Sequence, residues 1–145
     1  AFATFSHTDV VPVVKVGRLH VAELFHGPTY AFKDFGQQVL CRLIDYFAAK
    51  RGRKALLLVS TTGDTGPAAI RAVQGLGALE IVCFYPQGQI SELQERQMIT
   101  VDSPNVRVYA FEGDGDDMDA PIKSVSTDSA LKESREVSSV NSINV

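Results

Sequence analysis

The chain has 145 residues, of which 45% are hydrophobic and 21% charged, and its 14 basic and 17 acidic side chains give a net charge of −3. This composition is typical of a globular protein with one core, and it excludes a disordered chain. The sequence has no long basic run and no apolar stretch of the roughly 20 residues that a membrane helix needs, so we expect neither nucleic acid nor a membrane as a partner.

The first predicted elements are short and extended. Residues 10–16 are β-branched and apolar around Pro12, and residues 18–25 alternate loosely between apolar and polar side chains. Both patterns indicate strands. The sequence His-Gly-Pro-Thr at residues 26–29 predicts a turn, because the residue before a proline is biased away from the helical region.

A helix is predicted from about residue 32 to residue 50. Its apolar side chains, such as Phe35 and Leu40, fall on one half of the helical wheel, which we expect to be buried. Asp34 and Gln37 fall on the other half, which we expect to face solvent. Gly52 and its cationic neighbours predict the end of this helix.

The rest of the chain alternates between strand and helix patterns. Strands are predicted at 55–59, 80–85 and 105–111, and helices at 67–76, 91–98 and 120–135. Ser91 and Gln94 fit a capping box at the start of the helix over 91–98. The continuous apolar runs are typical of strands that are covered on both faces. The sequence therefore predicts an α/β fold with an open, mostly parallel sheet that is flanked by helices.

We expect residues 1–145 to form part of one α/β catalytic region. Within it we expect an entry segment at 1–31, an α/β core at 32–111, and an acidic loop with the start of the next region at 112–145. Because the chain begins at Ala1 and not at Met, and stops abruptly at Val145, we expect an incomplete fragment of a longer protein.

The two cysteines, Cys41 and Cys83, are far apart and lie in apolar surroundings. They form no CxxC pair, so we expect two buried free thiols and no disulfide or zinc framework. Reduced thiols and the lack of a signal peptide favour a cytoplasmic location. The sequence leaves the oligomeric state open.

Lys33 is the first candidate for chemistry. It lies in the first turn of a predicted helix, where the helix dipole disfavours a cation, and the helical wheel places it on the apolar face. Both effects favour the neutral amine, which is the form that condenses with an aldehyde. The alternative is a structural lysine whose amine reaches solvent from the helix end.

The second candidate is the loop of residues 60–66, Ser-Thr-Thr-Gly-Asp-Thr-Gly, between a predicted strand and a predicted helix. Loops at the carboxyl ends of parallel strands bind ligands, and backbone N–H groups at a helix start favour an anion. The loop lacks the Gly-Lys-Ser/Thr of a Walker motif. The alternative is an ordinary capped turn.

Other clusters fit no metal site. The three histidines are scattered without metal-ligand spacing, so we expect no metal there. The acidic residues between 114 and 119 lack the spacing and the terminal glutamate of an EF-hand, and they predict a solvated turn.

Four segments, in order along the chain, carry a family resemblance. They are Glu-Leu-Phe-His-Gly-Pro-Thr-Tyr-Ala-Phe-Lys-Asp-Phe-Gly at 23–36, Thr-Gly-Asp-Thr-Gly at 62–66, the stretch 86–98 that ends in Gln-Glu-Arg-Gln-Met, and Asn-Ser-Ile-Asn at 141–144. Together they resemble the threonine synthase family. The resemblance implies a pyridoxal 5′-phosphate enzyme of fold type II with a tryptophan synthase β-like architecture.

The resemblance also implies the roles of individual residues. Lys33 would bind the cofactor covalently and move substrate protons, and Asp64 would lie beside the cofactor ring. The implied substrate-binding residues are Ser60, Thr61, Thr62 and Thr65 for the α-carboxylate, and Asn141, Ser142 and Asn144 at the border of the pocket. The substrate would be a small phosphorylated amino acid, since the family reaction converts O-phosphohomoserine and water into threonine and phosphate.

Three other functions stay open at this point. A threonine synthase-like phospho-lyase would share the lysine segment and release 2-oxobutyrate. A truncated form without the family's downstream glycine-rich loop for the cofactor phosphate would be a non-catalytic binding or signalling protein. The sheet pattern alone would also fit a flavodoxin-like phosphate-binding domain.

Overall fold

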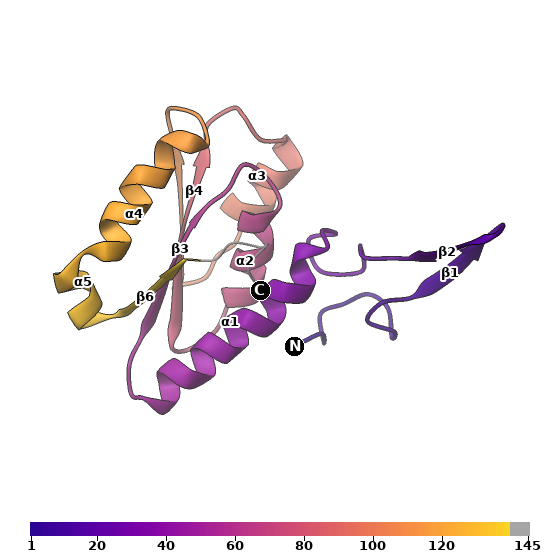
Figure 1. Cartoon of the computed structure of the whole chain (residues 1–145), viewed down its shortest axis with the longest axis horizontal. Helices are drawn as coiled ribbons and strands as arrows, with labels where there is room; N and C mark the ends of the chain where they lie inside the picture. The colour runs from indigo at the N-terminus through magenta and orange to yellow at the C-terminus, as the bar shows by residue number, and fades with distance from the viewer. Residues whose placement is uncertain (140–145) are drawn as a thin grey trace.

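The computed structural model describes residues 1–139 of the chain (Figure 1). The strands are β1 (Val13–Val16), β2 (Leu19–Ala22), β3 (Ala55–Ser60), β4 (Leu79–Pro86), β5 (Val106–Phe111) and β6 (Glu136–Ser139). The helices are α1 (Lys33–Lys50), α2 (Thr65–Val73), α3 (Glu92–Ile99), α4 (Asp119–Thr127) and α5 (Ser129–Ser134), with a short 3₁₀ turn at Asp116–Met118.

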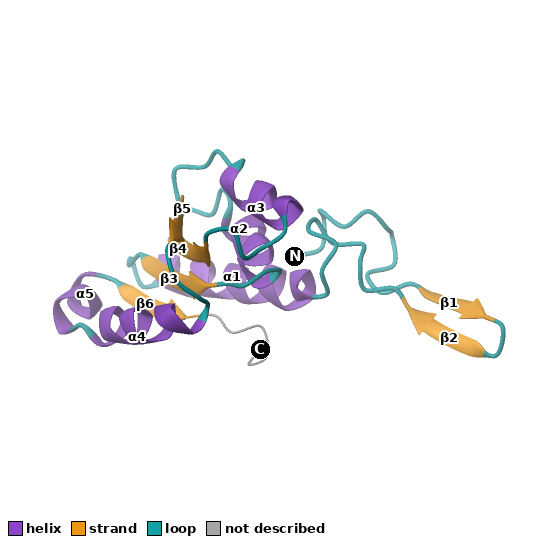
Figure 2. Ribbon diagram, turned by 90° about the horizontal axis from the view of Figure 1, so that it is seen from above, coloured by secondary structure: helices purple, strands orange, loops and turns teal. Residues whose placement is uncertain are grey.

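The two predicted N-terminal strands pair with each other. β1 and β2 form an antiparallel hairpin in which Val16 pairs with Leu19. Gly17, at φ 61°, takes the first position of the two-residue turn, a conformation that favours glycine in tight hairpins. The hairpin extends away from the rest of the molecule (Figures 1 and 2), and all eight of its strand residues are exposed.

The main sheet has four strands in the order β5-β4-β3-β6, and every neighbouring pair is parallel. The α/β class and the parallel sheet that the sequence predicts are therefore confirmed. Leu57 and Val59 of β3 point to the face that α1 and α2 cover, whereas Leu58 points to the face of α4. Figure 2 shows α1, α2 and α3 on one side of the sheet and α4 and α5 on the other.

The core lies between the sheet and α1 and α2. Its fully buried side chains include Leu57, Ile70, Leu79 and Ile81. Both cysteines are free and buried, as the sequence predicts, and burial raises the pKa of each thiol to about 12. Across residues 1–139, no helix has the length and apolar character that crossing a membrane requires.

The face that α1 buries differs from the prediction. Asp34, Gln37 and Gln38 are buried, whereas Leu43 is 49% exposed and Phe47 is 46% exposed. The helical wheel places the apolar residues on the buried side, so the prediction is wrong for these residues, although Leu40 and Ile44 of the apolar side do pack against the core. The reason is tertiary: the small side chains of Cys41 and Ala48, both at 0% exposure, share the polar side and let α1 approach its neighbours closely.

The C-terminal part also differs from the predicted single helix over 120–135. Asp128 leaves the helical region, and its side chain accepts a hydrogen bond from the backbone N–H of Leu131, so it ends α4 and caps α5. The chain then forms β6, which the sequence does not predict. A polar four-residue segment becomes a strand here because it pairs with β3.

Candidate functional site

Lys33 is the first residue of α1, and a tight turn precedes it. The backbone N–H of Tyr30 donates to the carbonyl of Gly27 at 3.2 Å, and Tyr30 has a left-handed φ of 64°. A non-glycine residue in this region is unusual, and such strain gathers at functional sites. The turn delivers Lys33 to the N-terminus of α1, where the Lys33 side chain is half-buried.

Asp34 fixes this turn and does not face solvent, contrary to the prediction. Its carboxylate is fully buried and accepts hydrogen bonds from the Thr29 backbone N–H and the Thr29 hydroxyl, each at 2.9 Å. Burial raises the pKa of the Asp34 carboxyl above 3.8, and the Thr29 hydrogen bonds offset part of that rise. Asp34 therefore positions Lys33 by tying the start of α1 to the preceding turn.

The loop between β3 and α2 is organised around Thr61. The Thr61 hydroxyl accepts hydrogen bonds from the backbone N–H groups of Gly63 at 3.1 Å and Gly66 at 3.0 Å, and it can donate to the Gly63 carbonyl at 3.1 Å. Thr61 is 4% exposed. Its hydroxyl is thus occupied by the loop itself, while its assignment to substrate binding stays a prediction.

Helix α3 holds both loops in place through two glutamines. Gln94 donates from Nε2 to the Asp64 carboxylate at 2.7 Å, and Gln97 donates to the Thr29 carbonyl at 3.4 Å. The N-terminus of α3 is itself fixed by the predicted capping box of Ser91 and Gln94, which the structure confirms. Through these contacts α3 sets the position of the 60–66 loop relative to the turn before Lys33.

The two candidate segments meet at Lys33 and Thr65. The Lys33 amine donates a hydrogen bond to the Thr65 hydroxyl at 2.7 Å, although 32 positions separate the two residues. No carboxylate among residues 1–139 forms an ion pair with this amine. A half-buried amine that a neutral hydroxyl holds has no counter-ion to displace before it reacts with an aldehyde.

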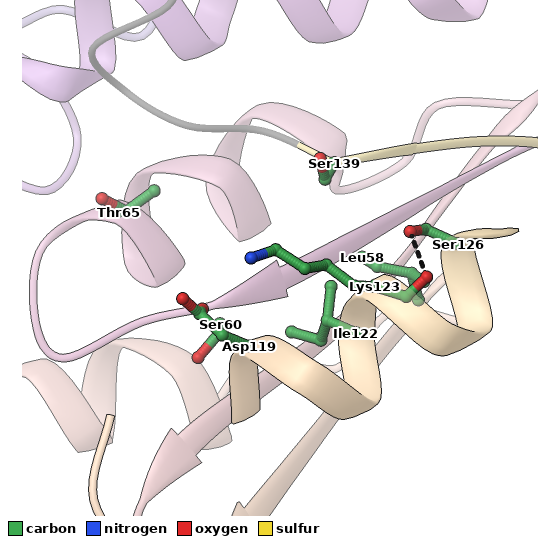
Figure 3. A pocket seen from close by; sticks show the side chains of 8 residues that line it. All are labelled: Leu58, Ser60, Thr65, Asp119, Ile122, Lys123, Ser126 and Ser139. Carbon is green, nitrogen blue, oxygen red and sulfur yellow. Dashed lines mark hydrogen bonds between the residues drawn. The ribbon is translucent and has the colours of Figure 1, made fainter. Parts of the chain in front are cut away.

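A cavity of about 380 Å³ lies beside Thr65, between β3, β6 and α4 (Figure 3). Its described lining residues are Leu58, Ser60, Thr65, Asp119, Ile122, Lys123, Ser126 and Ser139. Lys33 is not one of them, but Thr65 touches both the Lys33 amine and the cavity. The arrangement offers an amine at one end, hydroxyls in the middle and an open polar space at the other end.

The structure brings together Lys33, Asp64 and Thr65, and it places Ser60 on the cavity wall. Thr62 is exposed and faces Gly115 of the acidic loop. The predicted substrate residues Asn141, Ser142 and Asn144 lie outside the described residues.

Sequence reasoning gave no role in the site to Gln94, Gln97 or Lys123. The two glutamines act across 30 and 68 positions of sequence, which no local pattern encodes. Lys123 lies in a segment that periodicity describes only as a helix. Its position on the cavity wall depends on how α4 packs on β3.

No family model matches the chain. Comparison with curated proteins finds a relative from rat, named threonine synthase-like 2, that is 43% identical over 99% of this chain and 30% of its own length. A protein from Pseudomonas aeruginosa that is named threonine synthase is 40% identical over 99% of this chain and 31% of its own length. Among solved structures, pyridoxal-phosphate-bound threonine synthase from Brucella melitensis matches 99% of this chain and 31% of its own chain, with a TM-score of 0.91 and 41% identity. The chain matches one region of the threonine synthase family.

The chain spans about 30% of the length of the curated relatives that it matches. The resemblance to the threonine synthase family that the four sequence segments carry is thereby confirmed. Both the identity and the fold similarity extend over nearly the whole of this chain, so they include the Lys33 turn and the 60–66 loop.

Proposed function

We propose that this chain carries the cofactor lysine and part of the substrate site of a pyridoxal-phosphate-dependent carbon–oxygen lyase of the threonine synthase type. The proposed reaction converts O-phosphohomoserine and water into threonine and phosphate. The observation that carries the proposal is the contact between the Lys33 amine and the Thr65 hydroxyl at 2.7 Å. It joins the two segments of the sequence that resemble the family most specifically.

The residues at this point fit the aldehyde end of the cofactor. Lys33 offers an amine that is partly shielded from water and bonded to a hydroxyl, so a covalent bond to an aldehyde carbon requires no ion pair to break. Asp64, which Gln94 orients, would lie beside the cofactor ring. When bound, pyridoxal phosphate supplies an electron sink for carbanion chemistry.

The residues of this chain orient the substrate and move its protons. Lys33 Nζ would remove a proton from one carbon of the substrate and later return it to another carbon. Between these two proton transfers, Thr65 Oγ1 would hold the Lys33 nitrogen in place. Ser60 lines the cavity, and in this proposal its hydroxyl would hydrogen-bond the substrate. Asp34 does not reach the reacting atoms and positions Lys33 through Thr29.

The proposal is tested with the Lys33→Ala and Lys33→Arg variants in the full-length protein. We expect both variants to lack the visible absorbance band of the bound cofactor and to form no threonine from O-phosphohomoserine. The control is Lys132→Ala, which changes a solvent-exposed lysine and should keep both properties. Persistence of the band in Lys33→Ala would refute the role of Lys33, and a colourless wild-type protein would favour the non-catalytic alternative.

A second candidate reaction is the phospho-lyase reaction that releases 2-oxobutyrate and ammonia. It is favoured by the 43% identity to the rat protein named threonine synthase-like 2, compared with 40% for the threonine synthase of Pseudomonas aeruginosa. The two reactions differ in their products. Amino-acid analysis of the reaction mixture would detect threonine for the synthase, and a keto-acid assay would detect 2-oxobutyrate for the lyase.

A further inference from the structure

The turn that precedes Lys33 contains a strained residue. Tyr30 has a left-handed φ of 64° and is 69% exposed, so packing of its side chain does not hold this conformation. A strained backbone persists only where the surrounding structure over-determines it. Asp34 holds the end of the turn nearest α1 through Thr29. The opposite end of the turn must therefore be held as well.

His26 holds that opposite end, immediately before Gly27. Its Nε2 lies 2.7 Å from Glu23 Oε2, and its Nδ1 lies 3.3 Å from the Ser6 hydroxyl. The side chain of His26 is 17% exposed and that of Glu23 is 24% exposed, so water screens the pair only in part. We assign the Nε2 proton to the bond with Glu23, which leaves Nδ1 of the neutral ring as an acceptor for the Ser6 hydroxyl.

The N-terminal segment, residues 2–6, spans the whole turn. At one end, the backbone N–H of Ser6 donates to the His26 carbonyl at 2.9 Å. At the other end, the ring of Phe5 meets the ring of Phe35 edge-on, with 5.0 Å between the centroids. Figures 1 and 2 show the N-terminus beside the start of α1. This segment therefore contacts the chain both before and after the turn.

We propose that His26 is a positioning residue for the reaction, and that it joins residues 2–6 to the Lys33 turn as a clamp. This inference rests on the proposed function, because it assumes that Lys33 is the reacting amine. While the clamp is closed, the strained turn keeps one conformation and the Lys33 amine stays at the Thr65 hydroxyl. When the clamp opens, the strain at Tyr30 relaxes and the amine moves away from Thr65. A displacement of about 1 Å at a reacting group can cost about a hundredfold in rate.

The first experiment measures the reactivity of the Lys33 amine in the cofactor-free, full-length protein. Reductive methylation with formaldehyde and cyanoborohydride, followed by peptide mass spectrometry, gives the methylation rate of each lysine. His26→Phe keeps a ring but removes both polar contacts of the imidazole. We expect it to raise the rate at Lys33 about fivefold, the effect of losing one hydrogen bond. The exposed Lys132 is the internal reference, and its rate should not change.

Two further variants show whether the polar contacts of His26 cause this change. His20→Phe makes the same substitution in the exposed hairpin and should leave the rate at Lys33 unchanged. His26→Gln should stay close to wild type, since its amide can donate to Glu23 and accept from Ser6. Equal Lys33 rates in wild type and His26→Phe would overturn the inference. An equal rise in His26→Phe and His26→Gln would overturn it too.

Phe5→Ala tests the clamp from its other end, and it decides the question even if His26→Phe does not fold. The change removes the contact between the rings of Phe5 and Phe35 and leaves His26 untouched. We expect the methylation rate of Lys33 to rise about threefold, the effect of losing one aromatic pair. An unchanged rate in folded Phe5→Ala would show that residues 2–6 do not hold the turn.

The second experiment separates this inference from the proposed function. In the cofactor-loaded, full-length protein, His26→Phe should lower kcat for O-phosphohomoserine about tenfold and change KM less than about twofold, because the clamp positions the amine and touches no substrate. A raised KM with an unchanged kcat would contradict the positioning role. If Lys33 does not bind the cofactor, the proposed function fails, but the methylation rates still decide whether His26 positions the Lys33 amine.

Discussion

Gly27 lies directly against the buried Asp34 side chain at the start of α1. A Cβ atom at Gly27 would lie 2.4 Å from Asp34 Oδ2, a distance that real contacts do not reach. We therefore expect Gly27→Ala to displace Asp34 and to cost about 1–3 kcal/mol of unfolding free energy. The matched control is Gly77→Ala, where a Cβ meets no atom within 4 Å. Urea denaturation of the two variants compares the costs, and equal midpoints would contradict this packing.

Asp34 also makes stability depend on pH. Because burial raises its pKa above 3.8, the folded protein keeps the Asp34 proton at a pH at which the unfolded chain has released it. The contribution of Asp34 to stability is therefore complete below about 3.8 and is lost as the pH rises through the folded pKa.

The prediction is tested by comparing wild type with Asp34→Asn, which has no proton to release. From pH 4 to pH 7 the unfolding free energy of wild type, measured relative to the variant in urea, should fall. A difference that rises with pH would show that Thr29 lowers the pKa of Asp34 more than burial raises it.

At the scale of elements, the β3–α2 loop depends on one hydroxyl. Thr61→Val keeps the side-chain shape but leaves the half-buried N–H group of Gly63 and the buried N–H group of Gly66 without their acceptor. We expect a loss of about 1–3 kcal/mol for this change. Thr61→Ser keeps the hydroxyl and should cost about 1 kcal/mol or less. If the two variants unfold at the same urea concentration, the hydroxyl does not organise the loop.

Another prediction at this scale concerns the exposed apolar side chains of α1, such as Leu43. Leu57 of β3 is 0% exposed and Leu43 of α1 is 49% exposed, so the same substitution to alanine should have different effects. We expect about 2–5 kcal/mol for Leu57→Ala and less than about 1 kcal/mol for Leu43→Ala. Thermal or urea unfolding of the two variants measures this. A cost at Leu43 as large as at Leu57 would show that the apolar side of α1 is buried in solution.

The sequence predicts most elements because their patterns are local. Apolar runs mark β3 and β4, and the capping box marks the start of α3. The buried side of α1 could not be predicted, because Gln37 and Gln38 are buried by the packing of small neighbours and not by their own polarity. β6 was missed for a similar reason, since its pairing with β3 makes a polar segment extended.

At the scale of the molecule, the parallel order of the strands determines where the site forms. β3 and β6 end side by side, and Leu58 pairs with Ser139 at that edge. The loop after β3, the end of β6 and the start of α4 therefore meet around one cavity. Lys33 reaches the same edge because α1 packs against α2.

The candidate site could be predicted from the sequence only in part. Lys33 and the 60–66 loop can be identified because each has a dense local motif, and the structure brings the two into contact through Thr65. The contributions of Gln94 and Lys123 depend on the packing of α3 and α4 on distant segments, which no local motif records. The motif at 141–144 lies outside the described residues, so its role stays a prediction.

The most direct test of the account is chemical trapping of the cofactor on the full-length protein. Borohydride reduction in the presence of pyridoxal phosphate, followed by protease digestion and mass spectrometry, identifies the lysine that has formed a bond to the cofactor. The account predicts one stably modified peptide, with the adduct on Lys33. An adduct on another lysine, or no adduct at all, would contradict it.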